Sequence, residues 1–398
     1  MQNINRITVF EHQLLKVGQT ISGVEFKPNH FKLLERFRGN YDDERFNYYS
    51  LIHNGVKFKH YVGVLNLGGL QIEVLPKTDN SPDNKTIWKE HLIKMLSKVY
   101  KLQAHTPTNA QQQLKNSSVL DVFLQRFLDE VEKLLHIGLI KTYHKETANR
   151  NSLKGKIIWS KHLAKNIVHQ ERFYVSFTTY DRNHIMNRVL YKTLKVIPNV
   201  TRNSYIANKA NTLAFYFPEL MDITATDQTF DLMRFDRKSD GYRDAMSLAK
   251  LILLNYVPDN HNPKNSVLAL MFDMNKLWEE YVFVILKKRF HNHVVRAQVA
   301  KRFWEYKAIR PDIVVYDQTG KKPLIVIDTK WKCPTDNKPT DADLKQMFVY
   351  HLYWQVNNTV LLYPDVGRQP YSGDFHSIFN QDRLFGLTCH MMYFPIDG

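Results

Sequence analysis

The segment of residues 310–332, RPDIVVYDQTGKKPLIVIDTKWK, constrains the fold more than any other part of this sequence. It contains two short apolar runs, Ile313 to Tyr316 and Leu324 to Ile327, which are separated by a polar stretch with one glycine. Short runs of this kind, bounded by turn residues, predict strands. Charged residues stand at the ends of these runs. A buried ionic pair that served no function there would only cost desolvation energy. The segment therefore predicts two strands whose ends carry side chains with a function.

The flanking patterns predict the rest of this region. Apolar residues at helical spacing predict a helix from about Asn275 to Arg289 and another that begins near Asp341. The run Thr359 to Tyr363 predicts a further strand. An order of helix, strand, strand, helix and strand favours a mixed sheet flanked by helices. We expect residues 266–398 to form this C-terminal domain.

The N-terminal part is predicted to be rich in strands. Tyr61 to Leu67 and Leu70 to Pro76 alternate apolar positions around Gly68 and Gly69, as in a hairpin with a two-residue turn. A polar loop at residues 78–85 then precedes a helix with apolar residues at helical spacing. We expect residues 1–175 to form a β-rich domain that also contains helices.

Helical patterns dominate the middle of the chain. Ser118 is a plausible N-cap for an amphipathic helix that ends at Gly138. Further helices are predicted around residues 187–197 and 242–254, with connections at Pro198-Asn199 and at residues 258–263. We expect residues 176–265 to form a helical connecting region, in which the role of residues 199–238 is open. The expected fold class is thus α+β or α/β.

Length and composition narrow the class of protein. A chain of 398 residues fits two or three domains. The sequence has no apolar run of about 18 residues, no signal-peptide pattern at its start and only two cysteines, which predicts a soluble cytoplasmic protein. Its formal charge of +16 favours a polyanionic partner such as nucleic acid, although a basic balance also serves solubility alone.

The charged residues in segment 310–332 suit phosphodiester hydrolysis, which needs a hard cation, an activated water and positive charge near the phosphate. Residues two apart on a strand point to the same face, so Asp328 and Lys330 project together. Asp312 precedes Asp328 by 16 residues and lies near it if the two strands pair as a hairpin. We expect Asp312, Asp328 and the carbonyl of Thr329 to hold Mg²⁺, while Lys330 orients the attacking water.

Two flanking helices offer further candidates. Glu279 could reach the metal site directly or through a water, although Glu280 could be the inward residue, and a solvated helix position is an equally good reading. Gln346 and Tyr350 share one helical face, where helix packing is the alternative explanation. A bare Asp-x-Lys is a weak signal by itself, because many surface strands end in such residues. The apolar strand that ends at Asp328 and the Pro311-Asp312 pair before it are what favour a catalytic site.

Seven segments occur in the order typical of one known family. They are YVGVLNLGGLQIEVLPK (61–77), SLKGKI (152–157), YDRNHIMNRVLY (180–191), LWEEYV (277–282), RPDIVV (310–315), VIDTKWK (326–332) and DLKQMFVY (343–350). Together they resemble the McrC family, the nuclease subunit of GTP-dependent, modification-directed restriction systems of the McrBC kind. The resemblance extends over most of the chain.

The resemblance implies a nuclease core of the PD-(D/E)xK type with Asp312, Asp328 and Lys330 as catalytic residues. It also implies that Glu279 matches the acidic position on the helix, and that Gln346 and Tyr350 match the motif after the lysine. The implied substrate is double-stranded DNA, modified in such systems, and the implied partner is a McrB-like AAA+ GTPase hexamer to which the N-terminal region docks. The chain has no G-x-x-x-x-G-K-[ST] motif, so GTP is expected to bind the partner.

Two other classes of function compete with this prediction. One is a catalytically silent activator or DNA-binding subunit of the AAA+ partner, which intact Asp312, Asp328 and Lys330 oppose. The other is an enzyme of a different class, but the sequence has no His-Glu-x-x-His, no G-x-S-x-G and no glycine-rich dinucleotide motif. Its histidines show no ligand spacing. The modification that triggers cleavage is not encoded in any motif we recognise.

Overall fold

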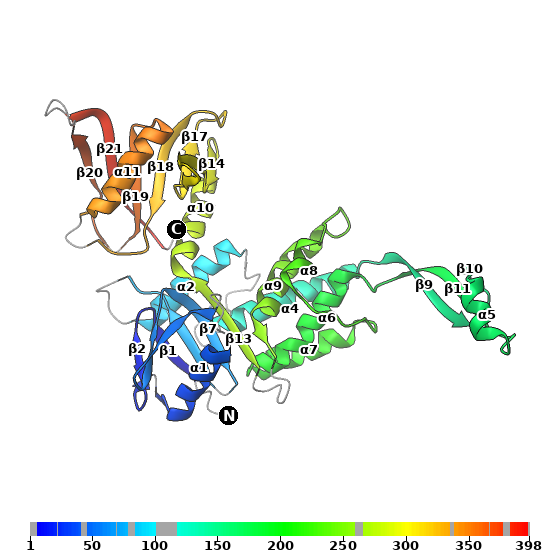
Figure 1. Ribbon diagram of the computed structural model, residues 1–398. Helices are drawn as coiled ribbons and strands as arrows, with labels where there is room; N and C mark the ends of the chain where they lie inside the picture. Colours follow the sequence, from blue (N-terminus) through cyan, green and yellow to red (C-terminus); the bar gives the residue numbers. More distant parts are fainter. Residues whose placement is uncertain are drawn as a thin grey trace. The chain divides into compact units, whose positions relative to one another are not determined.

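The chain forms two compact units in the computed structural model (Figure 1). The structure describes residues 6–21, 23–40, 46–68, 70–78, 84–100, 118–258, 266–334, 338–365, 367–376 and 383–396. Unit 1 combines Met1–Leu120 with Ala269–Gly398, and unit 2 is Asp121–Leu268. Unit 2 ends close to the predicted boundary after residue 265, and no unit boundary falls at the first predicted boundary, after residue 175. Strand β11, Phe173–Asp181, crosses the first boundary and pairs along its whole length with β9, Thr142–Arg150, so the chain cannot divide there.

The predicted N-terminal hairpin is confirmed. Strands β7, Tyr61–Leu67, and β8, Leu70–Leu75, pair antiparallel with Leu67 opposite Leu70. Gly68 has the positive φ of +53° that such a turn requires, and Gly69 lies outside the described residues. Strand β1, Arg6–Phe10, pairs parallel to β8, whose residues are all buried.

Strand β13, Val267–Asp273, extends this sheet in the order β1-β8-β7-β13. Gly63 allows the close approach of β7 to β13, because a Cβ at this position would lie 2.1 Å from the carbonyl oxygen of Leu270. Gly63 also has a φ of +132°. The sheet thereby fixes the strand that leads into α10, Met274–Arg289, one of the helices predicted from sequence.

Smaller elements complete the N-terminal part of unit 1. Helix α2, Lys85–Val99, is the predicted helix after the polar loop, and it packs against α10 and β8. The remaining elements are β2 Leu14–Lys16, β3 Thr20–Ile21, β4 Val24–Glu25, α1 Pro28–Asn40, β5 Tyr49–Ile52 and β6 Gly55–Phe58. Of these, β2, β6 and β5 form a three-stranded sheet, and β3 pairs with β4.

The predicted mixed sheet at the C-terminal end is also confirmed. It has the order β14-β17-β18-β19-β21-β20, in which β18, β19 and β21 run parallel and the other pairs are antiparallel. Its strands are β14 Val294–Ala297, β17 Ile313–Tyr316, β18 Pro323–Thr329, β19 Asn358–Pro364, β20 Tyr371–His376 and β21 Arg383–Phe394. A separate hairpin, β15 Lys301–Trp304 with β16 Lys307–Ile309, lies between β14 and β17 in the chain.

Two helices cover this sheet and position the candidate site. Helix α11, Asp341–Trp354, crosses one face of the sheet (Figure 1). It buries Met347, Tyr350 and Trp354 in one core cluster with residues of β17, β18 and β19. Helix α10 packs against β14 and β18. Thr340 caps α11 by accepting a bond from the backbone N–H of Asp343. The helix predicted to begin near Asp341 therefore begins there for a local reason.

Unit 2 is largely helical, and helices occupy most of the region at residues 176–265 that was predicted to be helical. It also holds a sheet at residues 142–181 whose strands were not predicted individually. Its helices are α4 Val119–Ile137, α5 Trp159–Asn166, α6 Ile185–Val200, α7 Ser204–Phe215, α8 Asp227–Asp231, the 3-10 helix η2 Asp240–Tyr242 and α9 Arg243–Leu254. Its strands β9 and β11 pair with β10, Lys156–Ile157, and the short β12, Tyr256–Val257, pairs with the first residues of β13. Within the described ranges, no helix has the length and apolarity that a membrane crossing requires.

Two details of unit 2 correct or explain sequence predictions. The predicted connection at Pro198-Asn199 is wrong, because α6 continues through Pro198 to Val200. Proline removes only one backbone donor, and a helix end tolerates that loss better than a helix interior.

The motif at 180–191 contains Asn187, which is fully buried and donates to the carbonyls of Ile140 and Arg182. Residues 199–238, whose role was open, contain α7 and α8.

Candidate active site

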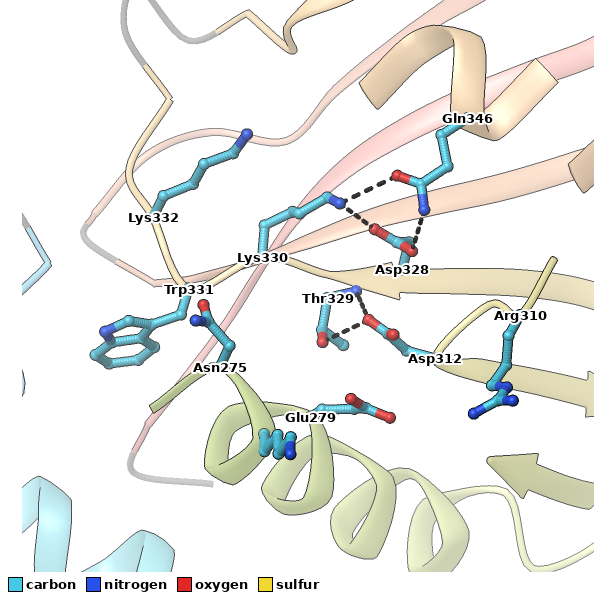
Figure 2. A pocket seen from close by; sticks show the side chains of 11 residues that line it. Asn275, Glu279, Arg310, Asp312, Asp328, Thr329, Lys330, Trp331, Lys332 and Gln346 are labelled. Carbon is cyan, nitrogen blue, oxygen red and sulfur yellow. Dashed lines mark hydrogen bonds and ion pairs between the residues drawn. The ribbon is translucent and has the colours of Figure 1, made fainter. Parts of the chain in front are cut away.

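Strand pairing brings the two predicted aspartates together. Ile313 lies opposite Ile327 in the antiparallel pair β17–β18, which places Asp312 beside the end of β18. The backbone N–H and the hydroxyl of Thr329 donate to Oδ2 of Asp312 at 2.7 and 2.8 Å. The hairpin that the sequence analysis left conditional is therefore present, and Thr329 fixes the orientation of Asp312 (Figure 2).

Asp328 and Lys330 meet as strand alternation predicts. Nζ of Lys330 lies 2.6 Å from Oδ2 of Asp328. The backbone N–H of Lys330 donates to the carbonyl of Leu362 at 2.9 Å, so the pairing with β19 holds this lysine just beyond the end of β18. Asp328 is only 3% exposed, whereas Lys330 opens toward the pocket.

Helix α11 contributes Gln346 and Tyr350 to the same cluster. The Gln346 amide nitrogen donates to Oδ1 of Asp328 at 3.2 Å, and its oxygen accepts from Lys330 at 3.2 Å (Figure 2). The same nitrogen lies 2.8 Å from the hydroxyl of Tyr350, which donates to the carbonyl of Arg310 at 3.2 Å. Tyr350 also packs in the core cluster. It therefore contributes to helix packing and also lies beside the site.

The helix residue that faces the pocket is Glu279. Together with Asp312, Asp328 and Lys330 it lines a pocket of about 350 Å³ that Glu280 does not line. In Figure 2 the carboxylate of Glu279 points from α10 toward that of Asp312. The side chain of Gln298 bridges the two, since its amide nitrogen donates to Glu279 and lies 3.5 Å from Oδ1 of Asp312.

The convergence of these carboxylates perturbs their proton affinities. Burial and the neighbouring charge of Asp312 raise the pKa of Asp328 to about 6, against the opposing effect of Lys330. Burial raises the pKa of Glu279 to about 7, opposed by its bond from Gln298 and assisted by Asp312. Burial acts to lower the pKa of Lys330, but the carboxylates of Asp328 and Asp343 outweigh it and raise this pKa. Lys330 therefore stays charged, and the pocket is rich in negative charge.

The donor set suits a hard divalent cation. The oxygens of Glu279, Asp312 and Asp328 are ligands of the kind that Mg²⁺ prefers. Oδ2 of Asp328 is buried, and its contact is the ion pair with Lys330. A cation would relieve the repulsion among the three carboxylates of this pocket, so the chemistry of these residues fits the expected metal, although their ligand atoms do not all lie within 4.8 Å of one another. For Thr329, the observed role is the support of Asp312 through its N–H and hydroxyl.

Two residues of the site escaped sequence reasoning. Gln298 follows β14 with a left-handed φ of +53°, a conformation that non-glycine residues rarely adopt outside constrained sites. No local pattern marks it. Asp343 lies 2.7 Å from Lys332 and 3.5 Å from Lys330. Asp343 begins the segment DLKQMFVY, and the resemblance of that segment to the McrC family was the only sequence feature that could have marked it.

A second set of possible metal ligands lies in unit 2. Ligand atoms of His144, Glu146 and Asp181 lie within 4.8 Å of one another, and no other such set occurs among the described residues. Nε2 of His144 contacts Glu146 at 3.0 Å, Asp181 at 3.4 Å and the hydroxyl of Thr179 at 3.0 Å. The expectation that histidines lack ligand spacing overlooked this set, because its members come from two strands that pair with His144 opposite Thr179.

Comparisons with known proteins agree on one family. The family model described as McrBC 5-methylcytosine restriction system component matches residues 56–364. A chain from a half-complex of a tetradecameric assembly of Thermococcus gammatolerans McrB AAA+ hexamers with bound McrC has a TM-score of 0.70 at 18% identity, and the match covers 98% of this chain and 94% of that one. A chain from the T. gammatolerans McrBC complex has a TM-score of 0.52 at 18% identity, with coverage of 75% and 89%. At this identity the structural matches establish a shared fold. No curated protein matches this sequence.

Proposed function

This chain belongs to the family of McrBC 5-methylcytosine restriction system components, and we propose that it is the nuclease subunit of such a system. In this proposal it cleaves double-stranded DNA with Mg²⁺ at the site of Asp312, Asp328 and Lys330. The observation that carries the proposal is the meeting of an acidic pair and a lysine at the ends of two paired strands. Thr329 binds Asp312 at 2.7 Å, and Lys330 binds Asp328 at 2.6 Å.

Glu279, Asp312 and Asp328 would hold the metal ion. When bound there, Mg²⁺ supplies positive charge that polarises the scissile phosphate and favours ionisation of a water. Gln298 keeps Glu279 and Asp312 directed toward one another, as its contacts with both carboxylates indicate. Thr329 holds Asp312 by two hydrogen bonds, so its orientation is set before substrate arrives.

Lys330 is the positive group of the site. Its raised pKa keeps it protonated at neutral pH, so it can donate to the attacking water or to a phosphate oxygen as negative charge develops. Asp328 and Gln346 hold its ammonium group at 2.6 and 3.2 Å, which limits the directions it can take. In-line attack on the phosphate would leave a 5′-phosphate and a 3′-hydroxyl, as in other nucleases with this motif.

A GTP-hydrolysing partner belongs to the proposal. The two similar structures are described as McrB AAA+ hexamers with bound McrC and as a McrBC complex. The present sequence has no G-x-x-x-x-G-K-[ST] motif, which agrees with nucleotide hydrolysis on a separate chain. We propose that this chain binds a McrB-like hexamer through its N-terminal part, within the residues 1–175 for which the sequence predicted docking, and stimulates its GTPase.

The proposal is tested by incubating the purified chain with modified and unmodified plasmid DNA and Mg²⁺, with and without the AAA+ partner and GTP. Wild type is expected to cleave only in the complete mixture, and Asp328→Ala and Lys330→Ala are expected to abolish cleavage. Lys321→Ala is the matched control, because Lys321 is an exposed lysine in the turn between β17 and β18. Normal stimulation of GTP hydrolysis without cleavage of any DNA would instead identify a silent activator subunit.

A further inference from the structure

The β15–β16 hairpin exposes an unusual set of aromatic side chains. Phe303, Trp304 and Tyr306 are 47%, 57% and 82% exposed, although they follow one another within a single short hairpin. The hairpin is not part of the six-stranded sheet. Exposed aromatic side chains gathered at one place are a mark of an interaction site, because folding alone would favour their burial.

Positive charge surrounds these rings. The hairpin and the residue that follows it contain four basic residues, Lys301, Arg302, Lys307 and Arg310, against the single acidic Glu305. In the part of the chain that the structure describes, the side chains of Lys307 and Arg310 have no ion-pair or hydrogen-bond partner. Their charges are therefore available to an anionic ligand.

The base of the hairpin is fixed to the candidate active site. Lys301 donates to the carbonyl of Tyr353 at 2.6 Å, and the hydroxyl of Tyr353 lies 3.4 Å from the carbonyl of Phe303. At the other end, Tyr350 donates to the carbonyl of Arg310 at 3.2 Å. Both tyrosines belong to α11, the helix that also carries Gln346. The hairpin is thus held in a set position beside the pocket, which Arg310 lines.

Chain geometry limits the distance between the hairpin tip and the pocket. Asp312 follows Tyr306 by six positions, and an extended chain over six steps spans at most about 21 Å. One turn of duplex DNA rises about 34 Å. A duplex with one phosphate at Asp312 and Asp328 therefore passes within one helical turn of the hairpin. A two-stranded ribbon is also of a width that the major groove admits.

We propose that the β15–β16 hairpin with Arg310 is a contact surface for duplex DNA beside the cleaved phosphate. This inference rests on the proposed nuclease function. Lys307 and Arg310 bind phosphates on either side of the scissile bond, while Trp304 and Tyr306 contact the sugar edge or the bases. Double-stranded DNA is favoured over a protein partner because the basic excess is continuous with the pocket in which the phosphate would react.

Binding of the full-length chain to a fluorescein-labelled 30-base-pair duplex tests the proposal, measured by fluorescence anisotropy in EDTA so that no cleavage occurs. We expect the double variant Trp304→Ala/Tyr306→Ala to raise Kd at least about tenfold. Lys307→Gln should weaken binding and reduce the slope of log K against log salt by about 0.9, the value for one phosphate contact. All these side chains are exposed, so the variants should fold normally.

Two variants on the same sheet body serve as matched controls. Tyr371→Ala removes an exposed tyrosine from β20, at the sheet edge far from β17 in strand order, and Lys321→Gln removes an exposed charge from the β17–β18 turn. Both should bind DNA like wild type. The proposal is overturned if the hairpin variants bind within twofold of wild type, or if the controls lose as much affinity.

Assembly with the AAA+ partner distinguishes a DNA-binding surface from a surface that contacts the partner protein. Hairpin variants that bind DNA normally but fail to co-elute with the partner in gel filtration would assign the surface to a protein contact and overturn the proposal. Loss of DNA binding in these variants would support the proposal even if wild type cleaved no DNA. In that case the nuclease function would fail while the DNA surface stood.

Discussion

Asp328→Asn should stabilise the metal-free chain at neutral pH while it removes cleavage. Asp328 is buried, and burial together with Asp312 raises its pKa from 3.8 to about 6. The folded chain therefore binds the proton more tightly than the unfolded chain does. The favourable contribution of the protonated carboxyl is complete below about pH 4 and is lost as the pH rises through about 6. Asparagine resembles the protonated acid and does not undergo this loss.

The size of the effect follows from the shift. A rise from 3.8 to about 6 corresponds to about 3 kcal/mol, at about 1.4 kcal/mol for each pH unit. Asparagine also weakens the hold on Lys330, which keeps Gln346 at 3.2 Å and Asp343 at 3.5 Å. The net gain at a single pH is thus smaller than 3 kcal/mol. The change in the gain between pH 4.5 and 7.5 is the quantity that reports on Asp328.

Thermal unfolding of both proteins in EDTA at several pH values measures this change. The difference in Tm, variant minus wild type, should rise by several degrees from pH 4.5 to 7.5, and saturating Mg²⁺ should stabilise wild type more than the variant. Asp343→Asn is the control whose stability difference should not change with pH in this range. Burial acts to raise the pKa of Asp343, but its bonds with Lys332 and Thr340 outweigh burial and lower it below 3.8. The ionised carboxylate therefore stabilises the fold fully above about pH 4. This variant should be less stable than wild type by a nearly constant amount from about pH 4.5 to 7.5. A pH-independent difference for Asp328→Asn would refute the reasoning.

Three further substitutions test separate parts of the structure. Glu279→Gln should weaken Mg²⁺ binding, measured by calorimetry, and reduce cleavage at least about 100-fold. Glu280→Gln should stay near wild type in both measurements, because Glu280 does not line the pocket. Equal losses in the two variants would contradict the assignment of Glu279. Lys330→Met should abolish cleavage but leave Mg²⁺ affinity within about threefold, and a large loss of affinity would mean that the lysine organises the metal ligands. Gly63→Ala should destabilise the chain by about 3 kcal/mol or more in urea unfolding, since its Cβ would lie 2.1 Å from the carbonyl oxygen of Leu270; an unchanged midpoint would show that β13 can shift.

Local sequence patterns predicted several elements of the site well. The runs that form β17 and β18 are short, apolar and bounded by turn residues, so their strand character follows from nearby residues alone. Helix α11 begins where Thr340 caps it, and the hairpin β7–β8 follows from alternation around two glycines. The prediction failed at Pro198, because α6 continues through it and a proline near a helix end removes only one backbone donor.

Strand pairing and helix placement could not be predicted from these patterns. The register that sets Ile313 opposite Ile327 brings Asp312 to Thr329, and a slip of one residue would reverse the faces of both strands. Gln298 reaches Glu279 and Asp312 from a left-handed position that has no sequence signature. Contacts across 320 residues of sequence, such as the 2.8 Å bond from Trp331 to Glu11, depend on the whole of unit 1.

The sequence by itself determined which chemical groups this protein has and which of them share a strand face. Alternation along a strand places Asp328 and Lys330 together in any fold that keeps that strand, because the backbone geometry is local. Tertiary structure alone decided that Glu279, and not Glu280, faces the pocket, and that the Asp328 carboxyl has a pKa of about 6. Burial and repulsion between carboxylates arise only when separate elements pack against one another, and these effects set the charge of the site.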